Sequence, residues 1–535
     1  MTWADDIVAQ ITERFAKEIK AGKPLILRDE KTLSGRVHIG SLRGVVIHGL
    51  LAQVLKEKGI DCTFKFEMND FDPMDELPAT LERRDEFKKY MGQPLYTVPS
   101  PVAGEKNYPS VFGNELKGVV EPLHLPIDYY ELAPLYRTGK FNDVIREALN
   151  HAKEIRAIYK EVSGSVKPED WYPLQVVCEK CGKIGTTQVT GWDGKNVTYT
   201  CKPDLVTWAK GCGNSGQMSP FDGNAKLPWK VEWPAKWKVM GVHIEGAGKD
   251  HSAAGGSRDI GRRICTEIFT YPEPLNIPYE FFNIGGKKMS ASKGLGASAK
   301  DVADLLPPKI LKLLMLRKQP NQPIDFDPEG VTIPQLFDEY DRLADHAFNR
   351  QEKPEPDFAR LFRFAQIDFP APPKDLWHMR FTLVAFIAQM PHLDLMKEAN
   401  AVKGSALTAD EKADLEERAA YARHWLATCA PAKFKFTLTE DTRPFKKEEF
   451  PLTDAQHKAL GLIAQKLQET PWEGEPVHKV LHAVKEELKM PPKEIFAPLY
   501  RLFLKRDDGP QMGWFLSTLK KEDVLQRIGY YAEAS

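Results

Sequence analysis

Near its N-terminus the chain reads PLILRDEKTLSGRVHIGS, residues Pro24 to Ser41, and this stretch decides the fold. Its apolar start predicts a short buried strand, and its glycine-containing turn leads into the helix that the apolar spacing indicates from Ile39 to Lys58. A second apolar run, Cys62 to Phe66, predicts another strand. Strand, loop, helix and strand in this order form a βαβ unit. We therefore predict an α/β fold with a doubly wound, parallel, Rossmann-like sheet.

Beyond this unit the sequence pattern changes twice. Residues 80–235 are irregular, rich in Pro, Gly, Lys and Trp, and contain the cysteine cluster, so they predict an insertion that splits the sheet. The sheet is expected to resume with strands at Val239–Ile244 and Tyr279–Ile284. After about residue 300 the spacing is helical to the end, which predicts an all-α C-terminal domain. Residues 1–20 predict an amphipathic helix.

Composition bounds the class of protein. The chain has 535 residues, of which 42% are hydrophobic and 28% are charged, and its formal net charge is −1. These values are ordinary for a globular protein of several domains, and they neither indicate nor exclude RNA binding. The N-terminus lacks the apolar core of a signal peptide, and no stretch approaches the roughly 18 apolar residues of a membrane helix. We therefore expect a cytoplasmic protein that does not enter a membrane.

The turn into the first helix is the first candidate site. In Ser34-Gly35-Arg36-Val37-His38-Ile39-Gly40-Ser41, His38 falls at the mouth of the helix, where free backbone N–H groups and the helix dipole favour phosphate. Its imidazole adds a donor toward phosphate oxygens, and Gly40 lets a nucleotide approach the backbone closely. The alternative is a capped helix start with an incidental histidine.

The second candidate site is the loop Lys288-Met289-Ser290-Ala291-Ser292-Lys293-Gly294. It follows the last predicted strand, and its lysines suit the negative charge that builds on a triphosphate when the α-phosphorus is attacked. Its serines offer further donors. The alternative is an ordinary solvated loop of lysines and serines.

Together these two elements resemble the His-Ile-Gly-His and Lys-Met-Ser-Lys-Ser motifs of class I aminoacyl-tRNA synthetases, with Ser41 and Ala291 as departures. The run Lys226 to Trp237, followed by Gly248-Lys249-Asp250-His251, is similar to the class I lysyl-tRNA synthetases of archaea and some bacteria. The C-terminal run Gly509-Pro510-Gln511-Met512-Gly513 extends the resemblance to nearly the whole chain.

This resemblance implies a reaction in two steps. The carboxylate of lysine attacks the α-phosphorus of ATP, with Mg²⁺ accompanying ATP, and a ribose hydroxyl at the 3′ end of tRNA(Lys) then attacks the carbonyl of lysyl-adenylate. It also implies that tRNA binds before lysine is activated. The residues expected in catalysis are His38, Gly40, Ser41, Lys288, Ser290 and Lys293. The residues expected to bind ATP are Ser34, Gly35, His38, Gly40, Lys288 and Met289.

A pocket for lysine needs an acid near the ammonium group and an apolar or aromatic wall along the methylenes. From their places in the motifs, the residues expected there are Glu30, Thr32, Asp70, Trp229, Glu232 and His251. The acids of this set are the candidate ammonium partners. The alternatives are core packing for Trp229 and a surface charge for Glu232. Arg258 stands where the family pattern has a tyrosine, and Asp29-Glu30 replace small residues.

Four of the seven cysteines fall within one window, at Cys178, Cys181, Cys201 and Cys212. Two cysteines separated by two residues form a knuckle that gives two thiolates to one tetrahedral Zn²⁺. Four thiolates leave no open position, so the expected zinc is structural. The alternative is a reduced, metal-free loop.

On the family pattern the chain divides into five parts. These are the first half of the catalytic domain (1–110), a zinc-bearing insertion that contacts the tRNA acceptor end (111–236), the second catalytic half with the Lys-Met-Ser loop (237–300), a stem-contact linker (301–345) and a helical anticodon-binding domain (346–535). A monomer is favoured. Three rivals stay open: another class I synthetase such as glutamyl-tRNA synthetase, for which Arg28 and Arg43 are available, a free-standing nucleotidyltransferase, and a tRNA-binding protein that has lost catalysis.

Overall fold

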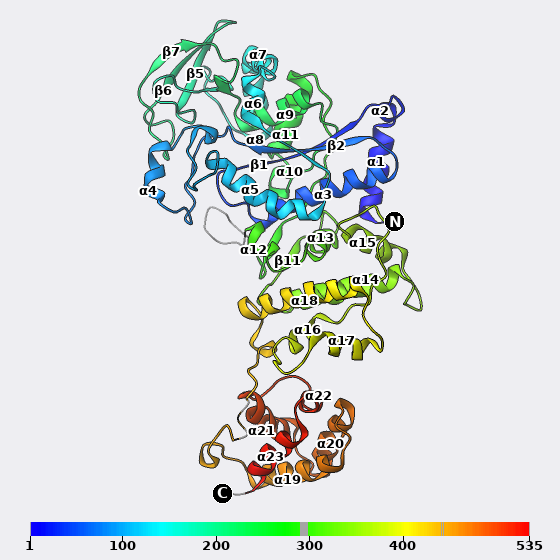
Figure 1. Cartoon of the computed structure of the whole chain (residues 1–535). Coiled ribbons are helices and arrows are strands. Elements are labelled where there is room, and N and C mark those ends of the chain that lie inside the picture. Colours follow the sequence, from blue (N-terminus) through cyan, green and yellow to red (C-terminus); the bar gives the residue numbers. More distant parts are fainter. Residues whose placement is uncertain (1, 289–297, 440, 442, 534–535) are drawn as a thin grey trace. The chain divides into compact units, whose positions relative to one another are not determined.

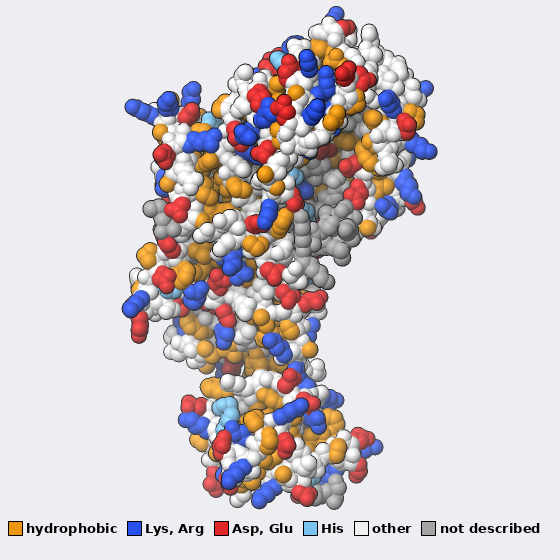
Figure 2. Space-filling model, turned by 180° about the vertical axis from the view of Figure 1, so that it is seen from behind, with side chains coloured by type: hydrophobic (Ala, Val, Ile, Leu, Met, Phe, Trp, Pro, Cys, Tyr) orange, Lys and Arg blue, Asp and Glu red, His pale blue; other side chains and the backbone are white. Residues whose placement is uncertain are grey.

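The chain folds into two compact units, shown in the computed structural model of Figure 1. The described residues are 2–288, 298–439, 441 and 443–533. The first unit comprises Met1–Asp327 and Arg342–Lys374, and the second comprises Pro328–Asp341 and Asp375–Ser535. Figure 2 shows acidic and basic side chains interspersed on the face that it presents. Within the described ranges, no helix is both long enough and apolar enough to cross a membrane.

The βαβ unit predicted near the N-terminus is confirmed. Strand β1 (Leu25–Thr32), helix α3 (Ile39–Glu57) and strand β2 (Cys62–Asn69) follow one another, and the two strands pair in parallel. Strand β3 (Ile127–Glu131) lies parallel to β2 on its other side. Both β1 and β2 are longer than the apolar stretches that predict them, because the polar residues at their carboxyl ends also pair with each other in the sheet. The carboxyl ends of the sheet therefore carry charged side chains.

On the other side of β1 the sheet continues through single parallel bridges. Leu27 bridges Ile244, and Ile244 bridges Leu275. The predicted strand at Val239–Ile244 is therefore wrong except for its last residue. Val239 and Met240 belong to the end of helix α9 (Trp229–Met240), and residues 241–243 form the turn that follows it. The tryptophans of α9 recur every four residues and bury one helical face.

The predicted strand at Tyr279–Ile284 is present only in its second half, as β9 (Phe282–Ile284). Strand β9 pairs in parallel with β11 (Ile324–Phe326) and antiparallel with β10 (Lys287–Lys288). Tyr279 instead forms a single bridge to Gly248. This bridge brings the segment before β9 alongside the segment after α9.

A lobe with its own antiparallel sheet is inserted after β3. Its three-stranded sheet consists of β5 (Thr187–Trp192), β6 (Val197–Cys201) and β7 (Ser215–Met218), and a ladder joins β4 (Gln175–Val176) to β8 (Ala225–Lys226). Helices α6 (Leu132–Arg137), α7 (Asn142–Asn150) and α8 (Ala152–Ser163) share a core with this lobe. Strand β3 lies within residues 111–236, so the main sheet extends into the range that the family pattern assigns to the insertion.

The remaining helices of the first unit surround the main sheet (Figure 1). The predicted N-terminal helix is present as two pieces, because the chain breaks at Phe15. The helices are α1 (Trp3–Arg14), α2 (Ala16–Lys20), α4 (Arg84–Phe87), α5 (Tyr108–Val120), α10 (Lys249–Ser252), α11 (Ser257–Arg263), α12 (Ala299–Ala303), α13 (Pro308–Leu316) and α15 (Pro356–Ala365).

The helical character predicted after residue 300 is confirmed, with β11 as the one strand among the described residues there. Helix α14 (Thr332–Ala347) belongs partly to each unit. The helices of the second unit are α16 (Phe381–Ile387), α17 (Leu395–Lys403), α18 (Ala409–Thr428), α19 (Asp454–Glu469), α20 (Gly474–Glu487), α21 (Pro492–Leu504), α22 (Met512–Ser517) and α23 (Lys521–Ala532). Thr453 caps the N-terminus of α19 through a capping box. Leu460 and Ile463 of this helix lie in the core, as predicted from their helical spacing.

Candidate active site

His38 is the N-cap residue of α3, with an extended backbone and no capping hydrogen bond from its side chain. The first N–H groups of a helix have no intrahelical partner, so this end suits a phosphate. The His38 Nε2 atom lies 3.3 Å from the Ser41 hydroxyl, and Nδ1 is buried without a partner among the described residues. Burial, helped by the charge of Lys31, lowers the pKa of His38 to about 4. The imidazole is therefore neutral near pH 7.

Two glycines of α3 allow close packing beside this histidine. A Cβ on Gly40 would lie 3.0 Å from the His38 ring. A Cβ on Gly44 would lie 2.5 Å from a carboxylate oxygen of Asp29 and 2.7 Å from the Tyr279 hydroxyl. Burial raises the pKa of Asp29 to about 8, so this carboxyl group is protonated near neutral pH. Around Gly40 and Gly44 the α3 side of the site is thus tightly packed, and His38 and Asp29 are both uncharged there near neutral pH.

A cavity of about 520 Å³ opens at the carboxyl end of β1 and the start of α3. The predicted site residues that line it are Glu30, Thr32, His38, Gly40, Ser41, Trp229 and His251. Other residues that line it include Asp29, Lys31, Asp72, Trp233, Glu245, Lys249, Tyr279 and Glu280. The fold thus brings most of the predicted phosphate-binding and lysine-binding residues together, at the edge where parallel sheets bind ligands.

A buried network of ion pairs forms one wall of this cavity. The guanidinium group of Arg28, which is fully buried, lies 2.5 Å from Glu30, 2.8 Å from Glu67 and 2.7 Å from Glu245. The Tyr130 hydroxyl accepts a hydrogen bond from Arg28 Nε and donates one to Glu67, both at 2.9 Å. Three carboxylates around one guanidinium group leave an excess of negative charge at this wall.

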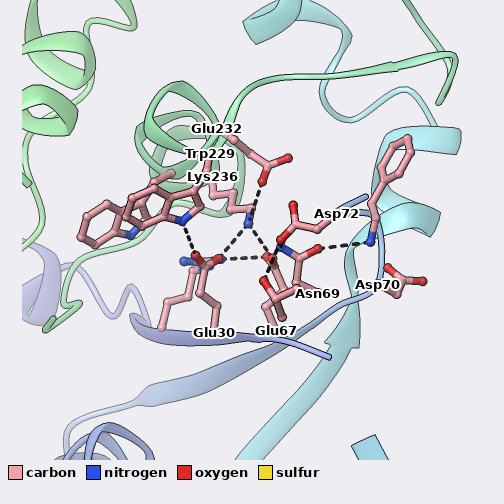
Figure 3. Close-up of polar contacts among 12 residues, drawn as sticks. Glu30, Glu67, Asn69, Asp70, Asp72, Trp229, Glu232 and Lys236 are labelled. Atoms are coloured by element: carbon pink, nitrogen blue, oxygen red, sulfur yellow. Dashed lines mark hydrogen bonds and ion pairs between the residues drawn. The ribbon is translucent and has the colours of Figure 1, made fainter. Parts of the chain in front are cut away.

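Lys236 of α9 is the second cation of the network. Its Nζ atom donates to Glu67 at 2.6 Å and to Glu30 at 2.7 Å, and lies 3.1 Å from Glu232 (Figure 3). Glu232, one helical turn earlier, also contacts Lys226 at 2.6 Å. Because every one of these groups is paired, the network holds its charges in fixed positions.

Asp72 lies where the network meets the cavity. Its carboxylate accepts hydrogen bonds from the Thr32 hydroxyl at 2.6 Å and the Asn69 amide at 3.0 Å, and it pairs with Lys226 at 2.9 Å. Although burial acts in the opposite direction, Lys226 and Thr32 hold the pKa of Asp72 below its ordinary value. Its side chain is 21% exposed, so an ionised carboxylate faces the cavity.

Aromatic rings complete this wall. Trp229 stacks on Trp233, with ring centroids 5.5 Å apart and planes 14° apart, and the His251 ring lies 5.1 Å from Trp229. The Trp229 indole N–H donates to Glu30 at 3.3 Å. Burial lowers the pKa of His251. Rings beside a carboxylate suit a ligand with an aliphatic chain that ends in a cation.

Four predicted residues lie outside the cavity. Asp70 accepts a hydrogen bond from the backbone N–H of Ala133 at 2.8 Å and lines a separate cavity of about 270 Å³, and Figure 3 shows it apart from the network. Glu232 is fully buried inside the network, so the alternative interpretation of Glu232 as a surface charge is wrong. Ser34 and Gly35 lie in the loop before α3 without lining the cavity.

The predicted Lys-Met-Ser loop lies mostly outside the described residues. The backbone of Lys288 pairs in β10 with β9, next to the part of the chain that lines the cavity. Met289, Ser290 and Lys293 fall in 289–297, which the structure does not describe.

Sequence reasoning missed most of the ion-pair network. The missed residues are Arg28, Glu67, Asp72, Lys236 and Glu245. Two local signals were available. Alternate residues of a strand share a face, which places Arg28 and Glu30 together on β1, and Lys236 follows Glu232 at the four-residue spacing of a helix.

The arginines that a glutamate pocket would need are engaged elsewhere. Arg28 is surrounded by carboxylates. Arg43 donates to the carbonyl groups of Glu280 at 3.0 Å and Gln319 at 2.8 Å. Arg258, the departure from the family pattern, lies outside the cavity and packs over the Trp237 ring at 4.5 Å. None of the three presents its guanidinium group to a ligand in the cavity.

The four predicted cysteines come together in the inserted lobe. Their sulfur atoms all lie within 4.8 Å of one another, and Cys178–Cys212 and Cys181–Cys201 are 3.6 and 3.7 Å apart. Zinc–sulfur bonds of about 2.3 Å in a tetrahedron set sulfur atoms roughly 3.8 Å apart, so this donor set fits one Zn²⁺. The bend before Cys212 needs glycine, because a Cβ on Gly211 would lie 2.3 Å from the Lys202 carbonyl oxygen.

The parallel sheet, the helix start at His38 and the helical C-terminal part are the elements expected of a class I aminoacyl-tRNA synthetase. The chain belongs to the family of class I (K) tRNA synthetases, whose model matches residues 1–368. A lysine–tRNA ligase of Methanocaldococcus jannaschii is 30% identical over 551 residues, covering 99% of this chain and 100% of the relative. Lysine–tRNA ligase 1 of Methanosarcina acetivorans is 32% identical, covering 99% and 98%. A solved glutamate tRNA ligase from Elizabethkingia meningosepticum aligns at 13% identity over 95% of this chain and 99% of its own, with a TM-score of 0.43.

Proposed function

We propose that this chain activates L-lysine with ATP and transfers it to the 3′ end of tRNA(Lys), with both steps at the cavity between β1 and α3. The family membership and the full-length similarity to lysine–tRNA ligases support this function. Neither step needs a protein nucleophile. Positioning and charge stabilisation are sufficient for a nucleotidyl transfer.

The observation that carries the choice of lysine is the excess of acid in the ion-pair network. Its acidic members among the described residues are Glu30, Glu67, Asp72, Glu232 and Glu245. Its basic members are Arg28, Lys226 and Lys236. A ligand ammonium group at Asp72 or Glu30 offsets this excess, whereas the carboxylate of a glutamate side chain would add to it. Trp229 and His251 then lie along the methylenes of the ligand.

The cavity wall formed by the start of α3, which lies across from the ion-pair network, receives the triphosphate of ATP. His38 and the first N–H groups of α3 offer hydrogen bonds to phosphate oxygens, with Gly40 and Ser41 beside them, while Lys288 supplies positive charge from the loop. Among the described residues, the one cluster of metal-ligand side chains is that of the cysteines. Mg²⁺ would bind chiefly through the phosphates of ATP and would neutralise part of their charge.

The large size of the chain fits a tRNA partner. In this proposal residues 111–236 contact the acceptor end, 301–345 the stem and 346–535 the anticodon. Unpaired bases are bound by stacking and by hydrogen bonds to their edges. In the helical domain the Trp514 side chain, which is 52% exposed, is a candidate for such stacking.

Aminoacylation of total tRNA with each of the twenty labelled amino acids tests this function. Labelling by lysine alone is the expected result. Labelling by glutamate overturns the lysine pocket. If the protein binds tRNA but attaches no amino acid to it, the chain is the inactive tRNA-binding alternative. If the protein forms an adenylated product in the absence of tRNA, it is the free-standing nucleotidyltransferase.

We also propose that the four cysteines hold one structural Zn²⁺. The sulfur–sulfur distances and the buried positions of Cys178 and Cys201 support this assignment. The expected metal content is one zinc per chain, and Cys201→Ser should lose it and melt at a lower temperature, because metal binding contributes to folding. The matched control Cys429→Ser lies outside the cluster and should keep its zinc. A metal-free wild-type chain with unchanged melting after chelation contradicts the assignment.

A further inference from the structure

Lys31 is a cavity-lining cation whose charge the surrounding protein leaves unpaired. It lies on β1 between Glu30 and Thr32, and successive strand residues point to opposite faces, so it stands on the side of α3. Two lysines line the cavity among the described residues. Lys249 pairs with Glu280 at 2.6 Å, whereas Lys31 forms no ion pair with any described residue. The stretch 289–297 contains no Asp or Glu that could pair with it.

The surroundings of Lys31 penalise its positive charge. Burial lowers the pKa of Lys31 below the ordinary value for lysine, against the opposing effect of Asp29 and Glu30. The charge of Lys31 in turn helps to lower the pKa of His38, so the two side chains face the same space. Lys31 is half-buried, and a partly desolvated cation without a partner is costly unless a ligand supplies the negative charge.

Apart from the loop that begins at Lys288, the described residues of this wall offer an anion no other unpaired positive charge. His38 is neutral near pH 7, and the N-terminus of α3 carries only a partial charge. In the proposed reaction the two anionic groups that enter the cavity are the carboxylate of lysine and the triphosphate of ATP. Lys31 lines the same cavity as His38, on the phosphate side, and as Glu30 and Thr32, on the lysine side. In the proposed reaction the carboxylate meets the α-phosphorus within this cavity.

We propose that Lys31 is a catalytic residue of adenylate formation, whose ammonium group donates hydrogen bonds to the non-bridging oxygens of the α-phosphoryl group. This role rests on the proposed function. A carboxylate oxygen of lysine forms a bond to the α-phosphorus, and the bond from that phosphorus to the α–β bridging oxygen breaks. The electron pair of the broken bond leaves on pyrophosphate. Lys31 keeps its proton throughout and stabilises the charge of the transition state.

ATP–pyrophosphate exchange with lysine, measured in the presence of total tRNA, tests this role. The enzymes compared are wild type, Lys31→Met, Lys31→Arg and the control Lys65→Met. Lys65 lies on the neighbouring strand β2, pairs with Asp128 at 2.6 Å and does not line the cavity. Lys31→Met should lower kcat by about 100-fold, the scale of one transition-state donor, and change the KM for lysine by less than about threefold. Lys31→Arg should recover at least about tenfold of this loss, and Lys65→Met should match wild type.

The pH dependence separates a catalytic role from a structural one. The kcat/KM for ATP, which reports the free enzyme, should fall in wild type at alkaline pH, below the ordinary lysine range, as Lys31 loses its proton. In Lys31→Arg this fall should move to higher pH, because arginine stays protonated. A kcat for Lys31→Met within about threefold of wild type, or a loss that arginine does not relieve, overturns the role of Lys31. A wild-type enzyme that exchanges pyrophosphate with glutamate but not with lysine overturns the proposed function instead.

Discussion

The two walls of the cavity handle charge in opposite ways. On the side of α9, Arg28, Lys226 and Lys236 are each paired with carboxylates at 3.1 Å or less. On the side of α3, His38 is neutral and Lys31 forms no ion pair within the part of the chain that the structure describes. The first wall is organised before any ligand binds, so it is suited to selecting an ammonium group. The second leaves its positive charge to be balanced by an anion, so it is suited to stabilising the charge that appears during reaction.

Removing one cation from the paired wall should have the largest effect. Lys236→Met leaves Glu30, Glu67 and Glu232 buried with less compensation, and breaking a buried pair in this way costs about 3–5 kcal/mol. Chemical denaturation followed by tryptophan fluorescence should show this loss in the free energy of unfolding. Lysine-dependent activity should be lost with it, because the acids that remain rearrange.

Lys238→Met is the matched control on the same helix. Lys238 pairs with Glu147 at 2.7 Å, but both side chains are about one-third exposed. A pair of this kind contributes about 0–1 kcal/mol. If Lys236→Met costs no more than Lys238→Met, the network does not organise the wall.

Removing a cation from the phosphate side should affect chemistry rather than folding. Lys288→Ala should lower the rate of adenylate formation by about two orders of magnitude or more, the scale of one transition-state donor. ATP–pyrophosphate exchange measures this rate, and melting temperature serves as the check on folding. Wild-type rates in Lys288→Ala would show that the loop takes no part in activation.

The two walls also differ in how far the sequence predicts them. The position of His38 and Gly40 at the start of a helix follows from a local pattern, a strand followed by a helix start. The paired wall depends on contacts such as Lys236 with Glu67, which are 169 residues apart, and no local pattern specifies them. Asp70 and Asp72 show that the sequence does not predict side-chain positions even for two acids that are two residues apart. Both follow β2, yet Asp70 caps the backbone at Ala133 while Asp72 reaches the cavity.

The neutral state of His38 predicts a pH dependence of stability. Its pKa is about 4 in the folded protein and near 6.5 when unfolded, so protons bind preferentially to the unfolded chain between these values. Stability should therefore fall as the pH decreases from 6.5 to 4, by up to roughly 3 kcal/mol at about 1.4 kcal/mol per pKa unit. His38→Asn should reduce this slope in denaturation curves measured across that window, and the part from His48, whose pKa burial also lowers to about 4, should remain. An unchanged slope would mean that His38 is not held neutral by the fold.

The most direct test of the division between the two walls compares Asp72→Asn with Lys288→Ala in lysine-dependent ATP–pyrophosphate exchange. Loss of a charged hydrogen bond to the ligand ammonium group should raise the KM for lysine about tenfold or more in Asp72→Asn, with kcat within about threefold of wild type. Lys288→Ala should show the reverse, a lower kcat with little change in the KM for lysine. If Asp72→Asn leaves the KM for lysine unchanged, or if both variants lower kcat alone, the paired wall does not select lysine and the account is wrong.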